Sequence, residues 1–320
     1  MHAKIMLLPA SKLGEKLSQY AEAILTDVSA AFSHSFSLMQ GKIGEKSLAA
    51  HQEALTDETV EACQKCQAVL LCDGDCEGAQ ELYDALDLPL RIRSFCVPDA
   101  LCGRHESPVN LWGGHMFSVD ADTLRRGMQS AFRFADEVGA RLTSVSPSGA
   151  SKAEWDAALR VQKAVIPGVA CLALPAADAM TSLIEAPGRL GLLLCPPYAG
   201  GIFDAAATAL CPLPGLMHDA AFDESIGVYA PCIPAGMQPG DEINPFAVAL
   251  AVAALLRFSL KLGREAGCVE AAVNNVLSAG WRTADIAAGG APKASGQAIV
   301  ELICEQISVA GELMSKGGMD

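Results

Sequence analysis

The sequence lacks any long apolar run, because no segment reaches the roughly 18 uninterrupted apolar residues that suggest a membrane-spanning helix. Aromatic residues are also scarce, at 5% of a chain that is 51% hydrophobic, so we expect a core of Ala, Leu and Val. Positive charge is in deficit, with 23 Lys and Arg against 37 Asp and Glu, which gives a formal net charge of −14. This balance argues against nucleic acid and anionic membranes as partners. A carboxylate ligand would need a local cluster of arginines.

Cysteine, in contrast, is abundant, with twelve residues in the chain. The first residues predict a strand rather than a signal peptide, so we expect a cytoplasmic protein with reduced thiols. The spacing C-x2-C-x5-C-x3-C resembles a zinc site, and it is formed by Cys63, Cys66, Cys72 and Cys76. However, the first two of these fall on a predicted helix of an α/β layer, where cysteine behaves as a small hydrophobic residue. We therefore expect free thiols rather than zinc.

Strand and helix patterns alternate along most of the chain. A helix capped by Thr56 or Asp57 runs directly into a buried strand at residues 68–72. Further strands are predicted at 90–95, 141–145 and 192–195, with amphipathic helices between them and a helix that starts near Ile202. Residues 212–229 are interrupted by Pro and Gly and predict an irregular connection, in which His218 would be exposed. The alternation predicts an α/β fold with parallel strands.

The most informative stretch is residues 244–286. It opens with Asn244-Pro245, continues through a helix of apolar periodicity that Pro245 would begin, and contains a second helix predicted at 268–278. It closes on Gly280-Trp281-Arg282-Thr283-Ala284-Asp285-Ile286. This pattern resembles the C-terminal signature of the isocitrate/isopropylmalate dehydrogenase family, the metal-dependent β-decarboxylating dehydrogenases, in which an Asn-Pro ends the adenine-binding loop.

The resemblance implies an isopropylmalate dehydrogenase-like two-domain α/β fold. Residues 1–98 and 212–320, from both chain ends, would form a large α/β domain on the cofactor side. Residues 99–211 would form a smaller central α/β domain that carries the dimer contact. The family's ligand site is expected in the cleft between the two domains.

The resemblance also implies a set of site positions, and most of them are altered here. Family members bind the substrate carboxylates with three arginines, hold Mg²⁺ or Mn²⁺ with three aspartates, and move protons with a lysine and a tyrosine. In this sequence the arginine positions fall on Tyr83, Arg93 and Val109, the tyrosine on Phe117, the lysine on Pro147, and the aspartates on Ala177, Gly201 and Ala205. Asp178 and Asp204 lie one residue from two aspartate positions, a rotation of about 100° on a helix. We therefore expect no metal site.

Several candidate residues remain. Arg91 and Arg93 lie on one face of a predicted strand and are candidates for binding a carboxylate. Lys152 is a candidate for the vacant lysine role, and His115 lies beside a glycine pair at the expected cleft. Residues 233–238 replace the family's adenosine-binding loop and form a shorter segment. The candidates for binding a nicotinamide cofactor are Asn244, Asp241 and Asp285.

These substitutions favour a family paralogue that lacks the metal and acid/base residues and requires no cofactor. Such a protein would be a dimeric ligand-binding or regulatory protein for a small carboxylate metabolite, with a catalytic homologue as a further partner. The alternative is a divergent NAD(P)-dependent 2-hydroxy acid dehydrogenase that acts in the cleft with Arg93, Lys152 or His115 in new roles. A third reading assigns a different chemistry to Cys195 and Tyr198.

Overall fold

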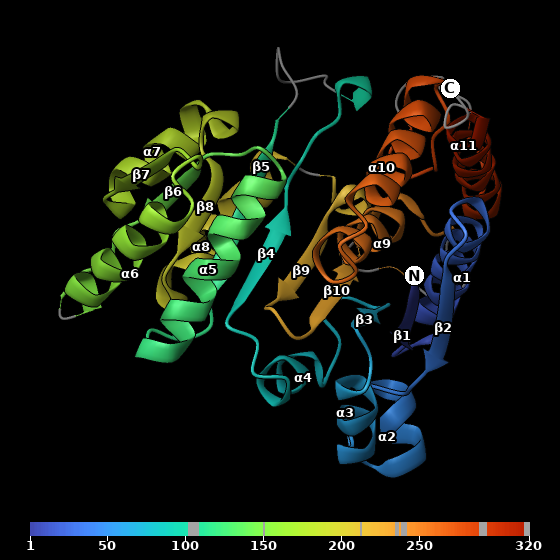
Figure 1. Cartoon of the computed structure of the whole chain (residues 1–320), viewed down its shortest axis with the longest axis horizontal. Helices are drawn as coiled ribbons and strands as arrows, with labels where there is room; N and C mark the ends of the chain where they lie inside the picture. The colour runs from blue at the N-terminus through green and yellow to red at the C-terminus, as the bar shows by residue number, and fades with distance from the viewer. Residues whose placement is uncertain are drawn as a thin grey trace. The chain divides into compact units, whose positions relative to one another are not determined.

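The structure is a computed structural model that describes residues 1–101, 109–149, 151–211, 213–233, 237, 242–287 and 293–316. The chain divides into two compact units, whose elements are labelled in Figure 1. Unit 1 comprises Met1–Leu86, Pro214–Ala220 and Ser225–Asp320, and unit 2 comprises Asp87–Leu213 and Ala221–Glu224. The units divide after Leu86 and Leu213, whereas the sequence predicted domain boundaries after residues 98 and 211. The domain assignment itself stays a prediction.

The sheet of unit 1 is parallel through four strands, in the order β2-β1-β3-β10. These strands are β1 (His2–Leu8), β2 (Ser35–Gln40), β3 (Ala68–Leu71) and β10 (Gly227–Pro231). Every residue of β3 and β10 is buried. Such continuous apolar strands are typical of parallel sheets that are covered on both faces. Beside β10 lies β9 (His218–Phe222), which begins in unit 1 and ends in unit 2.

A buried helix, α9 (Phe246–Phe258), forms the centre of the helical layer in unit 1. It packs on β3 and β10 and also contacts α1 and α10, so eleven of its thirteen residues are buried. The buried helix predicted after Pro245 is therefore confirmed. The other helices of this unit are α1 (Lys12–Ala31), α2 (Glu45–His51), α3 (Asp57–Gln64), α4 (Ala79–Ala85), α10 (Gly263–Ser278), α11 (Gly296–Lys316) and the short 3₁₀ turn η3 (Pro214–Leu216).

Unit 2 has its own strand order, β4-β5-β8-β6-β7. Strand β4 is antiparallel to β5, whereas β5, β8, β6 and β7 run parallel to one another. The bounds are β4 (Leu90–Ser94), β5 (Leu111–Met116), β6 (Leu142–Val145), β7 (Cys171–Leu174) and β8 (Gly191–Cys195).

Two helices cover opposite faces of β5. Met116 lies against Gly127 of α5 (Ala121–Glu137), whereas His115 lies against Gly200 of α8 (Pro197–Leu210). Because successive side chains on a strand point to opposite faces, α5 and α8 lie on opposite sides of the sheet. The remaining elements of unit 2 are α6 (Ser151–Val165), α7 (Ala176–Glu185), and the 3₁₀ turns η1 (Asp99–Leu101) and η2 (Pro187–Arg189).

Some element predictions were wrong. Residues 212–229 are not an irregular connection, because they hold η3, β9 and the start of β10. His218 consequently lies in a strand, with its Nδ1 atom buried, rather than in an exposed loop. Helix α8 begins at Pro197, before the predicted start near Ile202, and α10 begins at Gly263 rather than at residue 268. Within the described residues, no helix is both long and apolar enough to cross a bilayer.

Candidate functional site

An ionic cluster in unit 2 brings together two of the predicted site residues. Arg91 on β4 is paired with His115 on β5, and Arg93 is paired with Gly113. These four residues share one face of the strand pair, because they are spaced by two along each strand. Helix α8 packs on β5 and places the carboxylate of Asp204 among them. Asp204 Oδ1 lies 2.8 Å from His115 Nε2, and its Oδ2 lies 3.7 Å from Arg91 Nη2.

Two glycines make room for this cluster. A Cβ atom on Gly113 would lie 2.5 Å from Asp204 Oδ1, and a Cβ atom on Gly200 would lie 2.6 Å from His115 Cγ. Both distances are far below an ordinary van der Waals contact. Gly113 and Gly200 therefore allow α8 to approach β5 closely enough for the imidazole and the carboxylate to meet.

The cluster lies at the carboxyl ends of the parallel strands β5 and β8. His115 is in register with Cys195, the last residue of β8. In open α/β sheets this edge is where ligands bind, which favours the cluster as a binding site. Burial, together with the nearby charge of Asp204, raises the pKa of the Cys195 thiol. That thiol stays protonated and is a poor nucleophile, which argues against a covalent chemistry at Cys195.

The charges of this site suit a small anion. Arg91 and Arg93 supply two positive charges on the strand face that also carries His115. The Asp204 carboxylate lies within ion-pair distance of the imidazole of His115. The site can therefore attract a carboxylate to its arginines, beside an imidazole.

A second polar group forms in unit 1, where α9 begins. Asn244 Nδ2 donates a hydrogen bond of 2.9 Å to Asp285 Oδ2, and Asn244 Oδ1 accepts one of 2.9 Å from the Phe246 amide. Gly215 of η3 lies against both side chains, and a Cβ atom there would collide with them. Two of the predicted cofactor residues, Asn244 and Asp285, are thus joined, with both polar ends of the Asn244 amide engaged within the protein. Asp241 lies outside the described residues.

The comparisons with known proteins identify the family. The model of the isocitrate/isopropylmalate dehydrogenase family matches residues 4–80 and 113–303. This chain belongs to the isocitrate/isopropylmalate dehydrogenase family. It is 29% identical to the 3-isopropylmalate dehydrogenase of Chromohalobacter salexigens, with 95% of this chain and 98% of that protein covered. It is 25% identical to the enzyme of the same name from Clostridium pasteurianum, with 95% and 99% covered.

Solved structures show the same isocitrate/isopropylmalate dehydrogenase fold. A β-decarboxylating dehydrogenase from Thermococcus kodakarensis, solved in its apo form, aligns with a TM-score of 0.80 at 18% identity over 99% of both chains. The isocitrate dehydrogenase of Methylococcus capsulatus aligns with a TM-score of 0.78 at 18% identity, over 96% of this chain and all of that one. At this identity the two structures establish the fold only.

Lys152, the candidate for the vacant lysine role, has its contact outside the cluster. It is on α6, where its Nζ is 2.5 Å from Asp156 Oδ2 one helical turn away, and its side chain is 53% exposed. Exposed pairs of this spacing are typical of a solvated helix surface. The contact partner of Lys152 is thus Asp156 rather than a residue of the His115 cluster.

The positions where the resemblance places the metal aspartates carry no acidic side chain. Ala177, Gly201 and Ala205 are exposed and have no side-chain oxygen. Asp178 is exposed on α7, whereas Asp204 points inward to His115 and Arg91. Among the described residues, no three His, Cys, Asp or Glu side chains are grouped so as to hold a metal ion. A hard cation such as Mg²⁺ needs several oxygen ligands, and the side chains at these three positions supply none.

Val109, where the resemblance placed a third arginine, lies before β5 and forms an isolated bridge with Val97. His115 lies near the other end of β5. Sequence reasoning missed the contact between His115 and Asp204. The two glycine pairs were the available signal, because paired glycines indicate a close approach of backbones.

Proposed function

We propose that this family member binds a small carboxylate at the Arg91–His115–Asp204 cluster and does not carry out metal-dependent oxidative decarboxylation. The observation that supports this most is the orientation of α8. Its one acidic residue, Asp204, turns inward and is paired with His115 and Arg91. Its outward positions Gly201 and Ala205 offer no ligand for a metal. Without the metal, nothing at these positions stabilises the enolate that decarboxylation produces.

The absence of an acid/base pair supports the same proposal. Pro147 at the lysine position has no protonatable group, and Phe117 at the tyrosine position has no hydroxyl group. The protein would therefore sense or sequester a metabolite rather than transform it.

Calorimetry and a cofactor assay test this function together. Small hydroxy acids and dicarboxylates, with 3-isopropylmalate and isocitrate as the first probes, should bind saturably. Arg91→Met should weaken binding at least tenfold, because one charge-assisted contact contributes roughly 1.5–3 kcal/mol. Lys152→Met, which removes the same charge from an exposed site, should change affinity less than twofold. Mg²⁺-dependent NADH or NADPH production from either acid would overturn the proposal.

We further propose that the protein is a homodimer, and that a catalytic homologue is a second partner. Unit 2 carries large apolar side chains that are more than 45% exposed, on elements that follow one another in the chain. They are Val161 and Val165 on α6, Leu172 on β7, Ile184 on α7, and Tyr198 and Ile202 on α8. Apolar surface of this kind is usually covered by another chain.

A divergent NAD(P)-dependent 2-hydroxy acid dehydrogenase is the second candidate function. It is favoured by the His115–Asp204 pair, which is suited to moving a proton, and by the joined Asn244 and Asp285. Differential scanning fluorimetry separates the two functions. A ligand at 100 times its dissociation constant stabilises a protein by about 2.7 kcal/mol, which is several degrees in melting temperature. We expect 1 mM NAD⁺ or NADP⁺ to shift the midpoint by less than about 1 °C. A saturable shift that Asn244→Ala removes would favour the dehydrogenase.

A further inference from the structure

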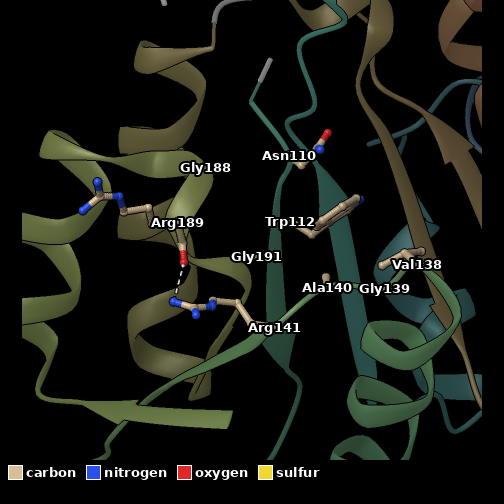
Figure 2. A pocket seen from close by; sticks show the side chains of 9 residues that line it. All are labelled: Asn110, Trp112, Val138, Gly139, Ala140, Arg141, Gly188, Arg189 and Gly191. Atoms are coloured by element: carbon tan, nitrogen blue, oxygen red, sulfur yellow. Dashed lines mark hydrogen bonds between the residues drawn. The ribbon is translucent and has the colours of Figure 1, made fainter. Parts of the chain in front are cut away.

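A cavity of about 560 Å³ lies in unit 2 between two turns (Figure 2). One turn leads from α5 into β6, and the other leads from η2 into β8. Its lining residues are Asn110, Trp112, Val138, Gly139, Ala140, Arg141, Gly188, Arg189 and Gly191. This volume is within the range of about 300–1,000 Å³ that small-molecule sites occupy.

The cavity is distinct from the His115 cluster. Its residues lie at the amino ends of β5, β6 and β8, whereas His115 and Cys195 lie at the carboxyl ends. Trp112 and His115 are three residues apart on β5, roughly 10 Å along the strand, and point to opposite faces of the sheet. Trp112 faces α5, where its ring meets Phe134 edge-on with the centroids 5.8 Å apart. A ligand here would not occupy the carboxylate site.

The charge of the lining is entirely positive. Arg141 and Arg189 are its charged residues, both exposed, in a chain whose net charge is −14. The Arg141 guanidinium has five N–H donors. In the described part of the chain, Nη1 donates a hydrogen bond of 3.3 Å to the Arg189 carbonyl. An anion is the natural acceptor for the others.

The absence of a side chain at Gly191 leaves room for Arg141. Gly191 has φ +64°, and a Cβ atom there would collide with the Arg141 carbonyl and lie 2.8 Å from Arg141 Cγ. The wall opposite Trp112 is largely backbone, because Gly188 and Gly191 lie in it. Trp112 therefore contributes a flat aromatic ring to the lining of the cavity, and Arg141 contributes a positive charge.

We propose that this cavity binds a small anion that carries a flat ring. The ring lies against the indole of Trp112, and the anionic group bonds to the Arg141 guanidinium. A nucleoside monophosphate and an aromatic carboxylate share this chemistry.

Isothermal titration calorimetry with two pairs of probes tests the proposal. AMP is compared with ribose 5-phosphate, and benzoate with cyclohexanecarboxylate, so that each pair differs in the flat ring. At least one ring-bearing anion should bind at least about fivefold more tightly than its partner, since stacking of a base on an aromatic side chain is worth roughly 1–3 kcal/mol. The pair that shows the difference identifies the source as a nucleotide or an aromatic acid.

Three variants locate the binding. Trp112→Leu and Arg141→Met should each weaken the tighter probe at least tenfold. Arg160→Met is the matched control, because Arg160 is an exposed arginine of α6 outside the cavity, and it should change affinity less than twofold. Thermal melting of each variant verifies that it is folded. Dissociation constants above about 1 mM for both AMP and benzoate would refute the proposal. Equal affinities of wild type and Arg141→Met would also refute it.

Discussion

Asp204 has its carboxylate in a nearly closed environment, with 9% of the side chain exposed. A charge in such a place is tolerated because His115 and Arg91 compensate it. Taking one partner out of a buried ionic group leaves the others unpaired, which costs roughly 3–5 kcal/mol. The same aspartate on an exposed helix surface would cost little to remove.

We therefore expect Asp204→Ala to lower the free energy of unfolding by about 3 kcal/mol or more. Asp178→Ala is the matched control, because Asp178 is exposed on α7, and it should cost less than about 1 kcal/mol. Urea denaturation at pH 7 measures both changes. Equal effects of the two substitutions would contradict the arrangement described for α8.

His218 makes stability depend on pH. Burial lowers the pKa of its imidazole to about 4, although the nearby charge of Asp219 opposes this shift. The unfolded chain then binds a proton near pH 6.5, whereas the folded chain does not until about pH 4. Stability is therefore fully present above pH 6.5 and is lost as the pH falls from 6.5 toward 4, by up to about 3 kcal/mol.

The His218→Gln variant should show a flatter acid limb than the wild type between pH 6.5 and 4. Urea midpoints at pH 7, 6, 5 and 4.5 provide the comparison, since Gln does not titrate in this range. Parallel curves for the two proteins over this window would show that His218 is not buried in its neutral form.

The sequence predicted the positions of some side chains in the site and not of others. Alternation along a strand put Arg91 and Arg93 on one face, because that inference needs only local spacing. The partner of His115 required a contact between residues 115 and 204, which no local pattern encodes. Asp204 was visible only as an aspartate one position away from a metal ligand. Rotation about a helix decides its role, and only the packing of α8 fixes that rotation.

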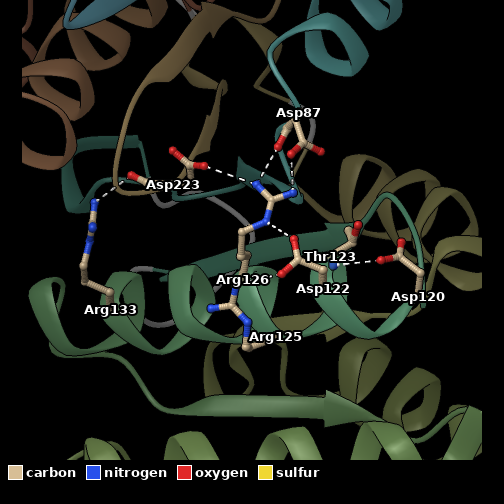
Figure 3. A network of polar contacts seen from close by, with 8 residues as sticks. All are labelled: Asp87, Asp120, Asp122, Thr123, Arg125, Arg126, Arg133 and Asp223. Atoms are coloured by element: carbon tan, nitrogen blue, oxygen red, sulfur yellow. Dashed lines mark hydrogen bonds and ion pairs between the residues drawn. The ribbon is translucent and has the colours of Figure 1, made fainter.

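Helix α5 is joined to neighbouring parts of unit 2 mainly through Arg126 (Figure 3). The guanidinium bonds to Asp87 at 2.7 Å, to Asp122 at 2.9 Å and to Asp223 at 3.3 Å. Burial lowers the pKa of Arg126, but its bonds to Asp87 and Asp122 raise it above the usual value. Arg133 also donates to the Asp223 carbonyl and Gln129 donates to the Glu224 carboxylate, so three side chains of α5 bond to the residues that follow β9.

Arg126→Met should destabilise the protein by about 1–3 kcal/mol, because three carboxylates lose a common partner. Arg125→Met is a close control, since Arg125 bonds to Asp122 from a side chain that is 60% exposed, and such pairs contribute less than about 1 kcal/mol. Chemical denaturation gives both values. Hydrogen exchange should also rise at residues 221–224 in the first variant only. A loss for Arg125→Met as large as for Arg126→Met would argue against this role of the network.

The elements that the sequence predicted are those with strong local patterns. Thr56 caps α3, with Oγ1 accepting from the Thr59 amide at 3.3 Å, as one of the two proposed caps. Helix α9 follows from its apolar periodicity. The strand β9 was missed because Pro and Gly on both sides read as loop signals, while its burial comes from tertiary packing. Helix α8 was predicted to start late because its first turn contains prolines and glycines, which are tolerated at a helix start.

The exposed apolar side chains of α6, β7, α7 and α8 form the surface that we propose as the dimer contact. We expect a dimer by light scattering at micromolar concentration. Ile202→Glu should shift the mass toward the monomer, because the charge would be buried in the interface. Val309→Glu provides the control, since Val309 is an exposed apolar residue of α11 in unit 1. A monomeric wild type, or equal masses for both variants, would exclude this interface.

The most direct measurement of whether this family member has lost its metal is calorimetry with Mn²⁺, with and without a small dicarboxylate. Ala177, Gly201 and Ala205 offer no side-chain oxygen, and Asp204 is paired with His115 and Arg91. We predict no saturable heat up to millimolar Mn²⁺ in either condition. Micromolar binding of Mn²⁺ that Asp178→Ala or Asp204→Ala abolishes would contradict the account and restore metal-dependent dehydrogenation as the function.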